Sequence, residues 1–148
     1  MKKTNFIARI IVEVLGAPKE HVEETLHDVV EKLKQEDGIK VTKDMSYEAE
    51  QQQNGLWSAF AEIEYEASTL KRMLEICFDY MPSTFEVLEP AGLEIDTNVI
   101  ADLFNDLLAK LHRYAMAIKN LQAENILLKE SLKKERRESG EKNPSKHS

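Results

Sequence analysis

The chain has 148 residues, of which 42% are hydrophobic and 32% charged, and it carries a net charge of −7. This composition is typical of a folded protein with a large solvated surface and excludes a disordered chain. The longest apolar runs are far shorter than a membrane span, and the single cysteine, Cys77, forms neither an intramolecular disulfide nor a multi-cysteine metal site, so we expect a cytoplasmic protein.

The first two expected elements are a strand over residues 6–15 and an amphipathic helix over residues 18–35. Ile, Val and Phe dominate the strand, and its charged residues Arg9 and Glu13 share one parity. A Gly-Ala-Pro turn at residues 16–18 separates it from the helix. The apolar residues of the helix recur at helical spacing, namely Val22, Leu26, Val29, Val30 and Leu33.

Two further strands are expected over residues 39–50 and 56–67. The first alternates weakly and is polar, as an edge strand is, and Met45 and Tyr47 share a parity there with Ile39. The Asn-Gly pair in residues 51–55 predicts a hairpin turn between the strands. The apolar face of the second strand comprises Trp57, Ala59, Ala61, Ile63 and Tyr65.

Ser68 is a candidate N-cap for a second helix, which Met81-Pro82-Ser83 ends. A short strand over residues 84–88 follows, and Asp96 then caps a long helix expected over residues 96–136. Residues 137–148 are mildly basic with mixed charges, and we expect a disordered tail. The expected buried stripe of the second helix is Leu70, Met73, Leu74, Cys77 and Met81.

The order of these elements resembles the ferredoxin-like split βαβ plan over residues 6–89. The predicted class is therefore α+β, with a ferredoxin-like domain over residues 5–95 followed by a long coiled-coil helix. In such a domain the sheet order is fourth, first, third, second strand, with both helices on one face. The chain also resembles small ligand-sensing modules of the ACT type, because Gly16 lies in the first strand–helix loop. Those modules have a glycine near their effector in that loop.

The other face of the predicted sheet is part apolar and part charged. Its apolar members form a patch that a monomer would not leave in water, so the sequence predicts a cover. Either the same face of a second subunit or the base of the long helix could supply it. This candidate sheet-face interface comprises Ile7, Ile11, Leu56 and Phe60.

A heptad seam runs along the long helix, with Asn125 as its only polar member. An apolar repeat every 3.5 residues keeps one helix in contact with another, and a buried Asn at an a position favours parallel, in-register pairs. Glu124 and Lys129 have the signs and spacing of an interchain pair. The seam comprises Ile100, Phe104, Leu107, Leu111, Tyr114, Ile118, Leu121, Asn125, Leu128 and Leu132.

We therefore predict a parallel homodimer whose interface comprises Tyr114, Ile118, Leu121, Asn125, Leu128 and Leu132. Three alternatives stay open: an antiparallel or higher oligomer, docking onto another protein, and packing of the helix on its own domain. Leu103 and Leu108 widen the apolar face and favour own-domain packing for the first turns.

Charge disfavours nucleic acid as a partner. Residues 1–128 carry 13 Lys and Arg against 23 Asp and Glu, a net charge of −10, and an acidic body repels phosphate backbones. A basic zipper would need a Lys/Arg-rich stretch before the seam, where Asp102 and Asp106 stand instead. An RNA-recognition module would need aromatics on the open sheet face, where Phe60 has Glu62 and Glu64 as neighbours.

Neither a metal site nor a catalytic site is predicted. His21, Glu24 and Asp28 share one side of the first helix, but no second ligand pair accompanies them, so a solvated polar face is expected. The carboxylates of Glu62, Glu64 and Glu66 on one strand face are expected to be a solvent-facing sheet surface. We predict no catalytic residue, cofactor or metal.

The function predicted from these patterns is a non-catalytic, homodimeric interaction or scaffold protein assembled through the long helix, with an unidentified protein as a further partner. The alternative is a small-molecule-sensing regulatory module with an effector near Gly16. An enzyme ranks last.

Overall fold

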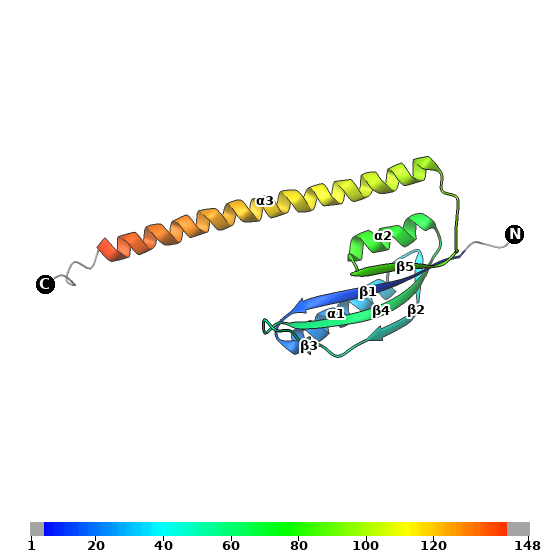
Figure 1. Cartoon of the computed structure of the whole chain (residues 1–148), viewed down its shortest axis with the longest axis horizontal. Helices are drawn as coiled ribbons and strands as arrows, with labels where there is room; N and C mark the ends of the chain where they lie inside the picture. Colours follow the sequence, from blue (N-terminus) through cyan, green and yellow to red (C-terminus); the bar gives the residue numbers. More distant parts are fainter. Residues whose placement is uncertain (1–4, 142–148) are drawn as a thin grey trace. The chain divides into compact units, whose positions relative to one another are not determined.

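The computed structural model describes residues 5–141 (Figure 1). Residues up to Leu103 form one compact unit, and those from Phe104 onward form a second. The elements in chain order are β1 (Phe6–Gly16), α1 (Lys19–Lys34), β2 (Ile39–Ser46), β3 (Glu50–Gln51), β4 (Trp57–Ala67), α2 (Leu70–Tyr80), β5 (Thr84–Glu89) and α3 (Thr97–Glu141).

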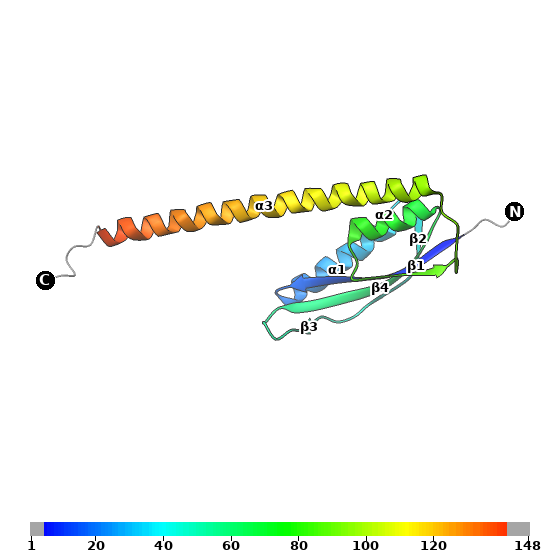
Figure 2. The same cartoon turned by 45° about the horizontal axis from the view of Figure 1, so that its top comes forward.

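The sheet of the first unit is antiparallel, with its strands in the order β2-β4-β1-β5 and the short β3 paired to the start of β4. This order is the ferredoxin-like split βαβ arrangement, in which β4 lies between the two strands that α1 connects. The helices α1 and α2 pack on the same face of the sheet (Figure 2). The predicted α+β class, strand order and one-sided helix layer are confirmed.

The core lies between this sheet face and the two helices. Even-numbered residues of β1 and odd-numbered residues of β4 are buried, because side chains alternate between the faces of a strand. Tyr65 is buried among them, and its hydroxyl donates a 2.6 Å hydrogen bond to the carbonyl of Met73 in α2. The core comprises Ala8, Ile10, Val12, Val22, Leu26, Val30, Leu33, Ala49, Ala59, Ala61, Ile63, Tyr65, Ala67, Met73 and Ile76.

Turns and caps position the sheet. The predicted hairpin turn is present, with Gly55 at a φ of 81° and Asn54 Oδ1 accepting a hydrogen bond from the Leu56 amide. Gly38, at a φ of 79°, lies against Arg72, whose guanidinium donates to the Asp37 carbonyl and to the Glu36 carboxylate. Arg72 thereby ties α2 to the loop that opens β2.

A β-bulge in β2 corrects the predicted facing of its second half. Val41 lies opposite Tyr65 on the helix side, but the register shifts before Lys43, and Met45 then lies opposite Glu62. The extra residue reverses the parity, so Met45 and Tyr47 lie on the open face, away from the helices. The edge strand also ends at Ser46, short of the predicted residue 50, and β3 follows separately.

The second helix ends at Met81 as predicted, but its N-cap and one residue of its buried stripe differ from the prediction. Thr69, not Ser68, caps α2, and its side chain accepts a hydrogen bond from the Arg72 amide. Met81 has a left-handed backbone and closes the helix, so its side chain leaves the predicted stripe and is exposed. Ile76 is buried in its place beside Met73.

The long helix begins as predicted after Asp96, whose side chain accepts a 3.1 Å hydrogen bond from the Asn98 amide. It continues to Glu141, five residues beyond the predicted end at residue 136. Residues 137–141 of the predicted tail are therefore helical. Residues 142–148, where the rest of that prediction falls, lie outside the described range.

Cys77 is half-buried in α2, and burial raises the pKa of its thiol. Because the thiolate is the reactive species, we expect Cys77 to react with a disulfide reagent several-fold more slowly at about pH 8 in the native protein than in denaturant. Absorbance of the released thiol measures this. Equal rates in the two conditions would contradict a sheltered Cys77.

Candidate functional site

The seam of α3 is a continuous apolar surface on a single helix. Beyond Leu111 every described side chain of α3 is exposed, and this includes the six residues predicted to form a dimer interface. A line of large apolar side chains in water is unfavourable at about 25 cal/mol per Å² of apolar surface. This exposure makes the seam the first candidate site, and its predicted residues all lie along one side of one helix.

A shallow groove of about 430 Å³ lies at the centre of the seam. Asn125 forms it together with two seam residues before it, one seam residue after it, and two neighbouring polar residues. A groove of this kind on a helix surface is the receiving half of knobs-into-holes packing. Its lining comprises Ile118, Leu121, Gln122, Glu124, Asn125 and Leu128.

Two large apolar side chains of α3 lie outside the seam. Ile126 and Leu127 are 58% and 62% exposed, next to Leu128 at 64%. In the heptad they occupy b and c positions, which face away from a partner in a two-stranded coil. The apolar surface here is therefore wider than a strict two-in-seven stripe.

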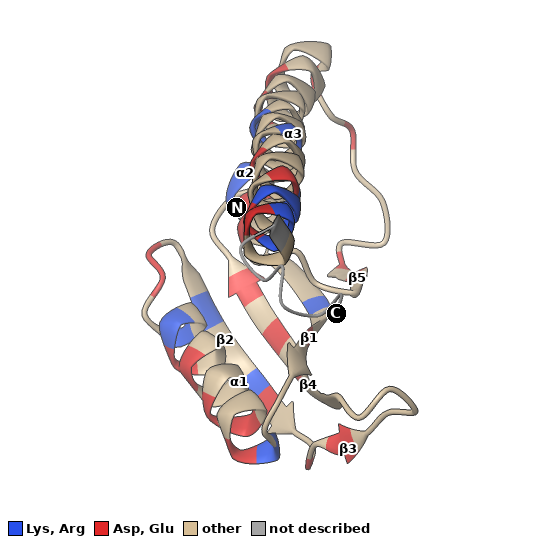
Figure 3. Cartoon of the chain, turned by 90° about the vertical axis from the view of Figure 1, so that its left-hand side faces the viewer, with Lys and Arg blue, Asp and Glu red and all other residues tan. Residues whose placement is uncertain are grey.

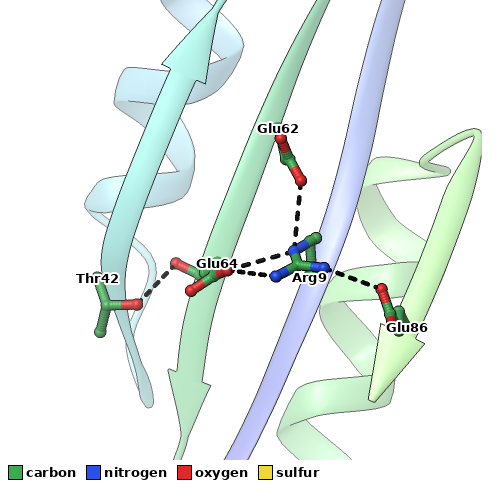
Figure 4. A network of polar contacts seen from close by, with 5 residues as sticks. All are labelled: Arg9, Thr42, Glu62, Glu64 and Glu86. Atoms are coloured by element: carbon green, nitrogen blue, oxygen red, sulfur yellow. Dashed lines mark hydrogen bonds and ion pairs between the residues drawn. The ribbon is translucent and has the colours of Figure 1, made fainter. Parts of the chain in front are cut away.

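The second candidate site is the sheet face opposite the helices, which we call the open face. Arg9 lies at its centre and has a glutamate opposite it on each neighbouring strand, Glu64 in β4 and Glu86 in β5. Its Nε and Nη2 donate to Glu64 Oε1 at 3.2 and 2.9 Å, and Nη1 donates to Glu86 Oε2 at 3.2 Å (Figure 4). Glu62 Oε1 lies 3.3 Å from Nε.

The hydrogen bond with Glu64 and the charges of the three carboxylates raise the pKa of Arg9. Thr42, at the bulge in β2, donates its hydroxyl to the backbone carbonyl of Glu64 (Figure 4). At Glu64, β4 is therefore joined to β2 through Thr42 and to β1 through Arg9. Glu62 and Glu64, which were expected to face solvent on the sheet surface, pair with Arg9, and with Glu86 they link β4, β1 and β5.

Replacing Arg9 by methionine should lower the midpoint of thermal unfolding at neutral pH, because three carboxylates then face one another without a cation. Adding Glu64→Gln to that variant should recover part of the loss, since one negative charge is removed. Lys40→Met, on the exposed edge strand of the same sheet, is the matched control and should change the midpoint less. Equal midpoints for Arg9→Met and Lys40→Met, measured by circular dichroism, would contradict this role.

The apolar half of the open face lies toward the hairpin. Ile11 is half-buried there, Phe60 is exposed, and Leu56 lies in the loop before β4. Ile7 is also half-buried, but it lies opposite Glu66, at the other end of β1 and beyond Arg9. The structure adds three residues that the sequence analysis did not assign to this face: Leu15, opposite Ser58, and Met45 and Tyr47, which the bulge brings there. Strand parity could have predicted Leu15, but no sequence signal predicts the bulge.

The rings of Tyr47 and Phe60 stack, with centroids 4.6 Å apart and planes inclined by 26°. Tyr47 also donates its backbone amide to the Phe60 carbonyl, which fixes the pair in register. The open face therefore combines an aromatic pair with a cluster of ion pairs, all within the first unit.

Acidic residues predominate in the first unit, as Figure 3 shows for α1, β3 and β4. Residues 5–103 contain eight Lys and Arg against 21 Asp and Glu, a net charge of −13. Within the described residues, no three His, Cys, Asp or Glu side chains are placed to hold a metal ion together. No helix between residues 5 and 141 is both long and apolar enough to cross a membrane.

No curated protein matches this chain. The model of the MJ0538 family matches residues 7–137, which run from β1 into the last turns of α3. The match includes both the sheet and the long helix, and it covers most of the 148 residues. The chain belongs to the MJ0538 family.

Proposed function

We propose that this protein is a non-catalytic homodimeric scaffold. In this proposal α3 pairs in parallel with α3 of a second copy, and the two sheet units that the pair carries engage another macromolecule. The observation that carries the proposal is the apolar seam along a helix too long for its own domain to cover.

The length argument is independent of how the two units are placed. At 1.5 Å per residue the 45 residues of α3 extend about 67 Å. The 11 residues of β4 extend about 36 Å at 3.3 Å per residue. Wherever the first turns of α3 lie, about half of the helix extends past such a sheet. Its apolar side chains require a partner from another chain.

Two features favour a parallel, in-register pair. A Leu121 knob from the second copy fits a hole of Ile118, Leu121, Gln122 and Asn125, and these four residues line the groove described above. In register, Asn125 of each copy meets its counterpart, and their amides can donate and accept reciprocally. Glu124 at g then lies near Lys129 at e of the second copy, with opposite charges.

Sedimentation of the full chain tests this proposal. At micromolar concentration we expect a species of twice the 17.0 kDa of one chain. A single 17.0 kDa species at that concentration would contradict it. A mass of three or four chains would support assembly through α3 but overturn the two-stranded form.

A small-molecule-sensing module is the second candidate, and it rests on the position of Gly16 in the first strand–helix loop, where ACT-type modules have a glycine near their effector. Gly16 ends β1 opposite Trp57, and an added Cβ would meet Val22 Cγ2 at 3.5 Å, an ordinary contact. Neither crowding nor a left-handed backbone therefore requires glycine at this position. A thermal-shift screen of amino acids and nucleotides tests for an effector, and the absence of any shift would remove this candidate.

A further inference from the structure

The apolar half of the open face forms a patch that we define by five residues: Ile11, Leu15, Met45, Tyr47 and Phe60. They come from β1, β4 and the end of β2, and cross-strand register brings them together around Phe60. Glu13 lies directly opposite Phe60, which places Ile11 and Leu15 diagonal to it on the same face. Met45 and Tyr47 flank Phe60 on the other side.

Water reaches most of this patch. Phe60 is 38% exposed and Leu15 is 60% exposed, with Met45 and Tyr47 between them. Aromatic residues and methionine are the types enriched where proteins meet, and the flexible Met side chain adapts to varied surfaces. A contiguous patch of this kind on a sheet face is typical of a docking surface.

Carboxylates alternate with the apolar side chains. Glu62 lies between Ile11 and Met45 in the register, and Glu13 lies beside Phe60. Across the whole face seven glutamates stand against three cations. The glutamates are Glu13, Glu50, Glu62, Glu64, Glu66, Glu86 and Glu89, and the cations are Arg9, Lys40 and Lys43.

The excess of negative charge on the open face indicates which kind of partner can bind there. A second copy would bring an identical acidic face against the first, in a unit whose net charge is already −13, and like charges brought together oppose association. Phosphate surfaces of membranes and nucleic acids are disfavoured for the same reason. A segment with an apolar stripe between Lys or Arg residues complements both the patch and its carboxylates.

We infer that the open face binds a cationic amphipathic helix of another protein. The apolar stripe of that helix covers Phe60 and Tyr47, and its basic residues pair with Glu13 and Glu62. This inference concerns a different surface from the α3 seam, and it names the kind of partner that the two sheet units of the proposed scaffold would hold.

A synthetic leucine–lysine peptide with helical periodicity is the first probe. We expect saturable binding to the full chain by fluorescence anisotropy, and an increase of about tenfold in Kd for Phe60→Ala or Tyr47→Ala. Val87→Ala is the matched control, because Val87 is 40% exposed but lies on the helix side of the sheet, opposite Ala8. It should leave the Kd unchanged.

Charge is tested separately. A peptide with glutamate in place of every lysine should not bind, and Glu62→Gln should weaken binding of the leucine–lysine peptide. Binding that is equal for the two peptides, or unaffected by both Phe60→Ala and Tyr47→Ala, would overturn the inference. Circular dichroism melting of each variant shows whether a lost signal comes from lost folding.

Cross-linking decides between a peptide and a second copy. With p-benzoylphenylalanine in place of Phe60, illumination should join the full chain to the leucine–lysine peptide. A chain-to-chain cross-link through position 60 would instead make this face a contact between copies and overturn the inference. Sedimentation of Phe60→Ala should still give the α3-dependent dimer, so this test and that of the proposed function can fail independently.

Discussion

Replacing Leu128 by aspartate is expected to dissociate the protein into single chains. Leu128 lines the groove at the centre of the seam, and in a pair of helices two aspartates would face each other in an apolar interface. A buried carboxylate without a cation is strongly unfavourable, and here two like charges meet. We expect the dimer Kd to rise by more than about 100-fold, measured by sedimentation equilibrium over a concentration series.

The neighbouring residue provides the control. Leu127 is the same residue type on the same helical turn and is 62% exposed against 64% for Leu128, but it occupies a position outside the seam. Leu127→Asp should therefore leave the Kd of a two-stranded pair close to that of the natural chain. If both variants dissociate the protein equally, the seam is wrongly assigned, and the wider apolar surface around Ile126 and Leu127 forms the contact.

Replacing Asn125 by leucine is expected to raise the stability of the helix pair and to loosen its specificity. The paired amides lose water on burial, and leucine removes a desolvation cost of about 1–3 kcal/mol. It also removes the only polar member of the seam, which otherwise disfavours other registers and other numbers of strands. We expect a higher melting midpoint, together with a broader mass distribution in sedimentation.

Asn120→Leu is the matched control, because Asn120 lies one turn earlier on the outward side of α3 and is also exposed. Asn120→Leu should raise the melting midpoint less than Asn125→Leu does, and it should broaden the mass distribution less. Identical behaviour of the Asn125 and Asn120 variants would place Asn125 on a solvent-facing surface of α3.

The alternation of apolar and polar residues along each strand is enough to predict most of the sheet unit. Residues 6–15 and 56–67 each place apolar side chains at every second position, and the structure buries those positions against the helices. The Asn54-Gly55 pair predicts the hairpin, since few other residues adopt its backbone. The strand order then follows from the order of elements along the chain.

The open face is harder to predict, because its composition depends on one extra residue in an edge strand. The bulge before Lys43 reverses the facing of Met45 and Tyr47, and the local sequence there offers no glycine or proline as a signal. The pairing of Arg9 with Glu86 likewise depends on the register of β5, which a six-residue strand does not reveal. The aromatic pair and the ion-pair cluster are therefore tertiary features.

The seam of α3 was predictable from its heptad spacing, and the helix is present over all its positions. What the seam binds stays a prediction. The repeat shows which side chains need a cover, but the identity and direction of the covering helix depend on a second chain.

Distances between spin labels on two copies test the parallel pair most directly. Labels at Met116→Cys and, separately, Arg137→Cys, both in a Cys77→Ser background, lie on the outward side of α3 and about 32 Å apart along its axis. A parallel, in-register pair predicts the same short distance between copies at both sites. An antiparallel pair would separate the copies by about 32 Å or more along the axis at one site at least, and that result, or the absence of any interchain distance, would contradict the account.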